Sequence, residues 1–127
     1  MTEEPKNSRY SRRVDVHYHA VFKTPSDTIE GTVTQISEGG VLFVSHKPVD
    51  INTKGVFALR VFSNEADVVV EGEIIYRLKE REGRDTLAYG ARFVALDARQ
   101  KEDIARVLRY SAVRERYAPK PPNPKAD

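Results

Sequence analysis

Alternating hydrophobic and polar positions predict six short β-strands, which cover most of the chain before residue 95. In residues 14–22, Val14, Tyr18 and Phe22 alternate with mainly polar residues, and a period of two is typical of a half-buried strand. Five more runs with strand character occupy residues 28–36, 41–44, 56–62, 68–79 and 86–94. Polar or glycine-containing turns separate these runs. This spacing predicts a mainly β fold, a small closed antiparallel barrel of six strands.

The fifth run is the longest, and its two faces differ. The face expected to meet the core carries Val68, Val70, Ile74, Tyr76 and Leu78. The opposite face, with Glu71 and Glu73, is expected to lie in solvent. Most aromatic residues also fall on the inferred core face, namely Tyr18, Phe22, Tyr76, Tyr89 and Phe93. Because single-stranded RNA is bound by exposed aromatic side chains, this placement argues against such a ligand.

The hydrophobic period changes after residue 96 and predicts a helix over about residues 97–117. Asp97 is a good N-cap, and Gln100 three residues later completes a capping box. Glu102 and Arg106 stand at i and i+4, a spacing that favours an ion pair. One helical face is expected to pack on the barrel, and it carries Ile104, Val107, Leu108 and Ser111.

Four arginines gather on another part of the same helix: Arg99, Arg106, Arg109 and Arg116. They lie opposite the hydrophobic positions, within about a third of the circumference. Two interpretations stay open, a solvated outer face and a docking stripe for an acidic partner protein.

Composition indicates one globular domain, expected at residues 9–117, between a flexible tail at 1–8 and a disordered, proline-rich tail at 118–127. Among the 127 residues, 39% are hydrophobic and 31% charged, which fits a soluble protein. Cysteine is absent, so disulfides and thiolate metal sites are excluded. No apolar run reaches the roughly 20 residues of a membrane span, and no signal peptide is recognisable. We expect a cytoplasmic protein without membrane insertion.

The net charge of +2 is too small to indicate bulk nucleic-acid binding, so no DNA or RNA partner is expected. The distribution of charge is more informative. Arg9, Arg12 and Arg13 stand directly before the first strand, with no acid among residues 9–13.

This basic lead-in and a later turn together carry the candidate chemistry. Guanidinium groups can fork onto phosphate oxygens or onto the edge of guanine. The turn Gln35-Ile36-Ser37-Glu38-Gly39-Gly40 offers a serine hydroxyl and exposed backbone N–H groups. The two features predict a site for a small phosphorylated purine ligand, made by Arg9, Arg12, Arg13, Gln35, Ser37, Gly39 and Gly40.

Catalysis and metal binding have little support in the sequence. No nucleophile elbow, P-loop or His-Glu-x-x-His motif occurs. His17 and His19 project from one strand face beside Asp15, but this ligand set is too thin to predict a metal site. We therefore expect no enzyme activity, no metal and no cofactor.

These residues resemble those of the PilZ domain family, bacterial six-stranded barrels with a C-terminal helix that serve as receptors for cyclic di-GMP. Arg9 and Arg13 match the family's Arg-x-x-x-Arg motif before the first strand. Ser37 and Gly40 match its Asp/Asn-x-Ser-x-x-Gly motif between the second and third strands. The resemblance covers roughly residues 9–110. It implies cyclic di-GMP as the ligand, a downstream protein partner, and roles in processes such as motility or biofilm formation.

Gln35 departs from the family pattern, which has Asp or Asn at this position. Glutamine keeps the amide oxygen but adds a methylene, and one misplaced hydrogen bond costs on the order of 1–3 kcal/mol. Two hypotheses follow. The domain relays cyclic di-GMP through ordering of its Arg-x-x-x-Arg segment, or it is a degenerate PilZ domain that binds no nucleotide and acts as a protein-interaction adaptor.

Overall fold

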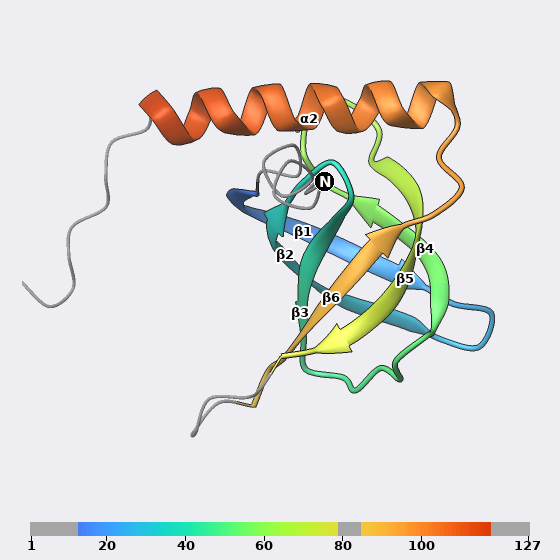
Figure 1. Ribbon diagram of the computed structural model, residues 1–127. Coiled ribbons are helices and arrows are strands. Elements are labelled where there is room, and N and C mark those ends of the chain that lie inside the picture. The colour runs from blue at the N-terminus through green and yellow to red at the C-terminus, as the bar shows by residue number, and fades with distance from the viewer. Residues whose placement is uncertain (1–12, 79–84, 118–127) are drawn as a thin grey trace, which may run out of the picture.

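Six antiparallel strands close into a barrel, and a long helix lies across one of its ends (Figure 1). The computed structural model describes residues 13–78 and 85–117. The elements are β1 (Val14–Lys23), β2 (Thr28–Ile36), β3 (Gly40–Ser45), β4 (Lys54–Leu59), β5 (Val68–Arg77), β6 (Leu87–Phe93) and α2 (Ala98–Tyr117). Neighbouring strands follow the order β1-β2-β3-β6-β5-β4, and β4 pairs with β1 to complete the closure. The predicted fold class is confirmed.

The fourth strand differs most from its predicted bounds. It begins at Lys54, which pairs with Glu73, and ends at Leu59, which pairs with Val68. The prediction extended it to Phe62, but the chain turns there, and the Glu65 N–H donates to the Phe62 carbonyl oxygen. The hydrophobic residues after Leu59 are partly buried against the core without continuing the strand pairing.

Three phenylalanine rings fill the middle of the barrel. Phe22, Phe43 and Phe57 have no exposed surface. The Phe22 and Phe57 rings stack with centroids 4.4 Å apart, and Phe43 meets Phe57 edge-on at 5.4 Å. Each such pair adds about 0.5–1.5 kcal/mol beyond the burial of its apolar area. The barrel interior is therefore packed solid, so a ligand site must lie on its wall or rim.

The helix begins with the predicted capping box. The Gln100 N–H donates to Asp97 Oδ1 at 2.8 Å, and the Asp97 N–H donates to Gln100 Oε1 at 3.0 Å. Ile104 and Val107 are buried against the core, as the pattern predicted. Within the described ranges, no helix combines the length and the hydropathy that crossing a bilayer requires.

The predicted ion pair between Glu102 and Arg106 is wrong. Arg106 instead donates two hydrogen bonds to the Glu65 carboxylate, at 2.9 and 2.6 Å, and its guanidinium lies 4.2 Å from the centre of the Phe62 ring. Glu102 accepts a hydrogen bond from Arg109 at 3.2 Å. The β4–β5 loop thus brings a carboxylate and an aromatic ring to Arg106, and this combination outweighs the weak i,i+4 preference.

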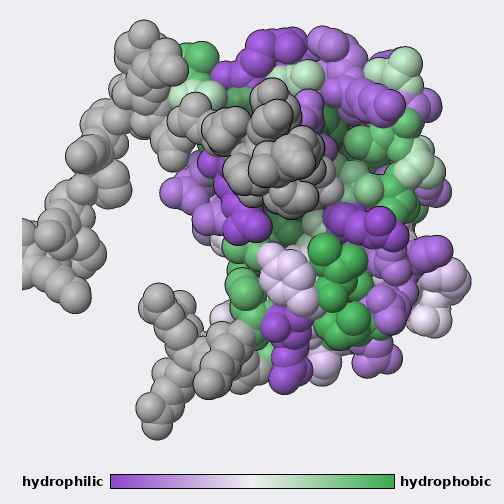
Figure 2. Space-filling view, in the orientation of Figure 1, coloured by the Kyte–Doolittle hydropathy of each residue, from purple (hydrophilic) through white to green (hydrophobic). Residues whose placement is uncertain are grey.

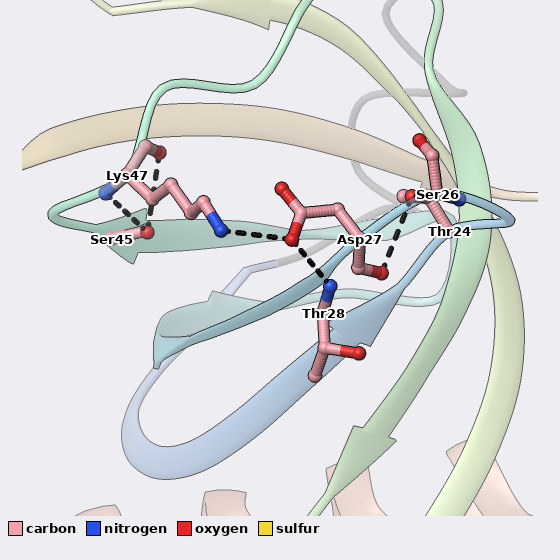
Figure 3. Close-up of polar contacts among 6 residues, drawn as sticks. All are labelled: Thr24, Ser26, Asp27, Thr28, Ser45 and Lys47. Atoms are coloured by element: carbon pink, nitrogen blue, oxygen red, sulfur yellow. Dashed lines mark hydrogen bonds and ion pairs between the residues drawn. The ribbon is translucent and has the colours of Figure 1, made fainter.

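The β1–β2 turn and the loop after β3 are joined on the side of the barrel away from α2 (Figures 1 and 3). Asp27 Oδ1 accepts hydrogen bonds from the Thr28 N–H and from Lys47 Nζ, both at 2.8 Å. The Lys47 ammonium therefore lowers the pKa of Asp27, with the Thr28 N–H as a second cause. This contact stabilises the end of the barrel opposite the candidate site.

Candidate ligand-binding site

Two neighbouring rows of residues on the outer wall of the barrel form the candidate site. Strand pairing sets the first row in register across β1, β2, β3, β6 and β5, as Asp15, Gln35, Leu42, Gly90 and Tyr76. The second row joins Gly40, Arg92 and Glu73. Between them runs a row of buried residues, Val14, Ile36, Val41, Ala91 and Ile74. Because Cβ atoms alternate along a strand, both flanking rows point outward.

Most residues of these outward rows line a pocket of about 160 Å³; Asp15 and Glu73 are not among its lining residues. Gly40 and Gly90 are among its lining residues. Arg13, directly before β1, and Gln35 of β2 line the pocket, and Ile75 and Tyr76 line it from β5. Figure 2 shows hydrophobic side chains gathered over β5 and β6 on the viewed face, with hydrophilic ones around them. An apolar surface bordered by cations suits a flat, anionic ligand.

Tyr76 forms an aromatic wall of the pocket, and its predicted place in the core is wrong. The pairing of β5 with β6 shifts between Ile74 and Tyr76, which leaves Ile75 as an extra residue. Tyr76 is therefore 38% exposed, and Leu78 is equally exposed. A Cβ on Gly90 would lie 2.1 Å from the Tyr76 ring, so the ring rests directly on the glycine. Such a supported ring can stack on a purine base.

Arg92 is held at the edge of the pocket by a buried carboxylate. Its Nη2 and Nε donate to Glu73 Oε1 at 2.8 and 3.1 Å. Glu73 is 9% exposed, which corrects the expectation that its side chain is solvated. The Arg92 side chain is 59% exposed, so its remaining N–H groups can reach a ligand phosphate.

Gln35 has one satisfied amide atom and one unsatisfied one. Its Nε2 donates to Asp15 Oδ1 at 3.1 Å. Its Oε1 is buried and accepts no hydrogen bond from any residue in the described ranges. Leaving a buried acceptor unpaired costs about 1–3 kcal/mol. A ligand donor placed beside this oxygen would remove that cost.

The Ser37–Gly40 turn is a tight hairpin connection from β2 to β3. The Ser37 N–H donates to the Gly40 carbonyl oxygen at 2.9 Å, and the Gly39 N–H donates to Ser37 Oγ at 3.3 Å. A Cβ on Gly40 would lie 2.0 Å from the Ala91 carbonyl oxygen, so only glycine fits this close strand approach. The turn thus brings the Ser37 hydroxyl and a glycine backbone without side chains to the pocket.

The structure brings most of the predicted site residues together. Arg13, Gln35, Ser37, Gly39 and Gly40 line the same pocket. Arg13 is exposed, and among the described residues it forms no ion pair. The predicted residues Arg9 and Arg12 lie outside the described ranges.

Sequence reasoning missed the half of the pocket that β5 and β6 provide. The lining residues from these two strands include Ile75, Tyr76, Gly90 and Arg92. Gly90 and Arg92, two positions apart in the last strand, could have been recognised as facing the same side. The outward position of Tyr76 depends on an irregular pairing that simple alternation does not reveal. Within residues 13–78 and 85–117, no three His, Asp or Glu side chains form a group that could hold a metal ion.

The fold and the pocket define a β-barrel domain with a candidate ligand site on its outer wall rather than in its packed interior. The chain belongs to the PilZ domain family, since the model of that family matches residues 7–110. The resemblance inferred from the arginine and serine-glycine motifs is confirmed. No curated protein matches the chain.

Solved PilZ structures share the fold at low sequence identity. The Bacillus subtilis inhibitor of motility (MotI/DgrA) matches with a TM-score of 0.69 and 14% identity, over 88% of this chain and 53% of that one. The PilZ domain of YcgR from Escherichia coli, with c-di-GMP, matches with a TM-score of 0.68 and 15% identity, over 86% and 96%. The PilZ domain of CeSA from a cellulose-synthesizing bacterium gives 0.55 and 18%, over 83% and 99%. The chain therefore spans about half of the inhibitor of motility and nearly all of the two separate PilZ domains.

Proposed function

We propose that this PilZ domain is a receptor for cyclic di-GMP that relays the level of this second messenger to a partner protein. The observation that carries the proposal is the convergence of Arg13, Ser37 and Gly40 on one pocket with Tyr76 and Arg92 opposite them. Guanidinium groups would bind the phosphates, and the Tyr76 ring would stack on a guanine. The similar YcgR domain, whose structure includes c-di-GMP, supports this choice of ligand.

The Arg-x-x-x-Arg segment is the proposed moving part of the receptor. Arg9 and Arg13 would close together over the ligand, since both belong to the lead-in to β1. A segment that becomes ordered on binding changes a surface that a partner can read. We expect amide hydrogen exchange in residues 5–14 to slow at saturating cyclic di-GMP. Unchanged exchange in that segment would rule this mechanism out.

Calorimetry with cyclic di-GMP tests the proposed function. The wild type should give saturable heat, and the double variant Arg9→Ala/Arg13→Ala should give none. The matched control is Arg99→Ala/Lys101→Ala, which removes the same charge from exposed positions of α2 outside the pocket. Equal loss of binding in both double variants would indicate general electrostatics rather than a site.

The adaptor hypothesis remains the second candidate because Gln35 replaces the family's Asp or Asn. Its proposed docking surface was the arginine stripe of α2. Two of these arginines have carboxylate partners within the chain, Arg106 with Glu65 and Arg109 with Glu102. This pairing reduces the positive charge that an acidic partner would meet. Absence of heat at high micromolar ligand, with the barrel folded, would favour the adaptor over the receptor.

A further inference from the structure

Asp15 determines which end of the Gln35 amide faces away from β1. The two residues stand opposite each other in the β1–β2 register, and Gln35 Nε2 donates to Asp15 Oδ1 at 3.1 Å. An ionised carboxylate accepts hydrogen bonds and donates none. If the amide turned by half a revolution, Gln35 Oε1 would meet a carboxylate oxygen, and two acceptors repel. The charged neighbour therefore keeps the NH2 group on its own side.

The amide oxygen is consequently held on the other side, as an acceptor without a donor. Gln35 lines the pocket, and its Oε1 is buried with no hydrogen bond from the described part of the chain. An acceptor in this condition favours any ligand group that can donate to it. It also disfavours a ligand that places a second acceptor there.

We propose that Asp15 is a positioning residue for base selectivity, acting through Gln35. With the amide oxygen held on the side away from Asp15 and lacking a donor, the site would prefer a purine edge that donates N–H groups to it. Guanine donates from N1 and N2, whereas adenine has an acceptor at N1. This inference rests on the proposed function, but it concerns the choice between bases rather than binding itself.

If Asp15 acted only through its charge, its removal would change the affinity for both dinucleotides and not the preference between them. A cyclic dinucleotide carries two negative phosphates, so the loss of a nearby carboxylate should strengthen binding of guanine and adenine forms alike. The positioning role predicts a loss of preference between them. The ratio of the two dissociation constants therefore separates the two explanations.

The binding experiment compares cyclic di-AMP with cyclic di-GMP in wild type, Asp15→Ala, Gln35→Ala and the double variant. We expect Asp15→Ala to lower the preference for cyclic di-GMP by about tenfold. In the Gln35→Ala background the same change should have no further effect, because the two residues act as one unit. Asp15→Asn, which keeps an acceptor oxygen, should retain part of the preference.

The matched control for charge is Glu30→Ala, which removes an exposed carboxylate from β2 outside the pocket. It should leave the ratio unchanged. An unchanged ratio in Asp15→Ala, or equally tighter binding of both dinucleotides, would overturn the proposal. So would an additive effect of the two substitutions in the double variant.

A second measurement needs no ligand. The side-chain NH2 resonance of Gln35 should be shifted by its carboxylate partner in the wild type and move to the position of a free glutamine in Asp15→Ala. The same resonance in both proteins would overturn the fixed orientation. Failure of the wild type to bind any cyclic dinucleotide would overturn the proposed function, while this resonance would still decide the orientation of the amide.

Discussion

At the scale of single residues, glycines have a large effect on the pocket because they carry no Cβ. Gly40 and Gly90 lie in different outward rows. A Cβ on Gly40 would meet the β6 backbone, and Gly90 lies under the Tyr76 ring. Gly39, by contrast, has open space where a Cβ would be. These three glycines give a graded set of substitutions in which the same added methyl group meets backbone, a ring or solvent.

Gly90→Ala should weaken ligand binding without unfolding the barrel. The new methyl group would displace the Tyr76 ring, which is exposed and can move. Since stacking of a base on an aromatic ring contributes about 1–3 kcal/mol, the affinity for cyclic di-GMP should fall about tenfold or more. Calorimetry and thermal melting measure the two effects. An unchanged affinity would show that Tyr76 is not part of the binding surface.

Gly40→Ala should instead destabilise the fold. Its methyl group would collide with the Ala91 carbonyl oxygen, which belongs to a paired strand and cannot move freely. Overpacking of this kind costs about 1–3 kcal/mol. Denaturant unfolding of the wild type, Gly40→Ala and Gly39→Ala measures their free energies of unfolding. Gly39→Ala should be as stable as the wild type. Equal stability of all three proteins would contradict the described approach of β3 and β6.

At the scale of elements, one hydroxyl pair joins the barrel to its helix. Tyr18 of β1 and Ser111 of α2 form a hydrogen bond of 2.6 Å. Ser111 is 3% exposed, so its hydroxyl needs this partner. Burial raises the pKa of Tyr18, although the hydrogen bond to Ser111 opposes that shift. Tyr18 lies three positions after Asp15 in β1, so the contact connects the strand that carries Asp15 to α2.

The raised pKa of Tyr18 predicts a specific pH dependence. The folded protein holds the phenol proton more tightly than the unfolded chain, whose ordinary value is 10.0. The resulting stabilisation is complete below that pH and is lost as the pH rises through the folded-state pKa. The difference in free energy of unfolding between wild type and Tyr18→Phe should therefore be constant up to about pH 9 and shrink as the pH rises above 10.0. A constant difference would contradict the burial of this hydroxyl.

The same hydroxyl pair allows a test of helix docking. Ser111→Ala should cost about 1–3 kcal/mol because it leaves the Tyr18 hydroxyl without its partner. Tyr18→Phe/Ser111→Ala should cost less than the sum of the single changes, because removing both groups leaves none unpaired. Denaturant unfolding of the two single variants and the double variant measures the three changes in the free energy of unfolding. Strict additivity would mean that the hydroxyls do not act together.

At the scale of the whole molecule, the sequence predicted the barrel, but it predicted only one half of the candidate site. Strand period and capping residues encode β1 to β6 and α2 locally, so the six-stranded barrel with its C-terminal helix followed from the pattern. The half of the pocket near Ser37 also followed from its motif. The half near Tyr76 did not, because the extra residue Ile75 in β5 reverses which face the following side chains occupy. The burial of Glu73 also depends on a partner, Arg92, that lies on another strand.

A map of backbone amide chemical shifts during titration with cyclic di-GMP tests the receptor account most directly. We predict saturable shifts confined to residues 5–14, the segment 35–42, Ile75 and Tyr76, and the segment 90–92. Asp27 and Lys47, on the opposite side of the barrel, should not move. Shifts that never saturate, or that gather around Asp27 and Lys47 rather than around Ser37 and Gly90, would contradict it.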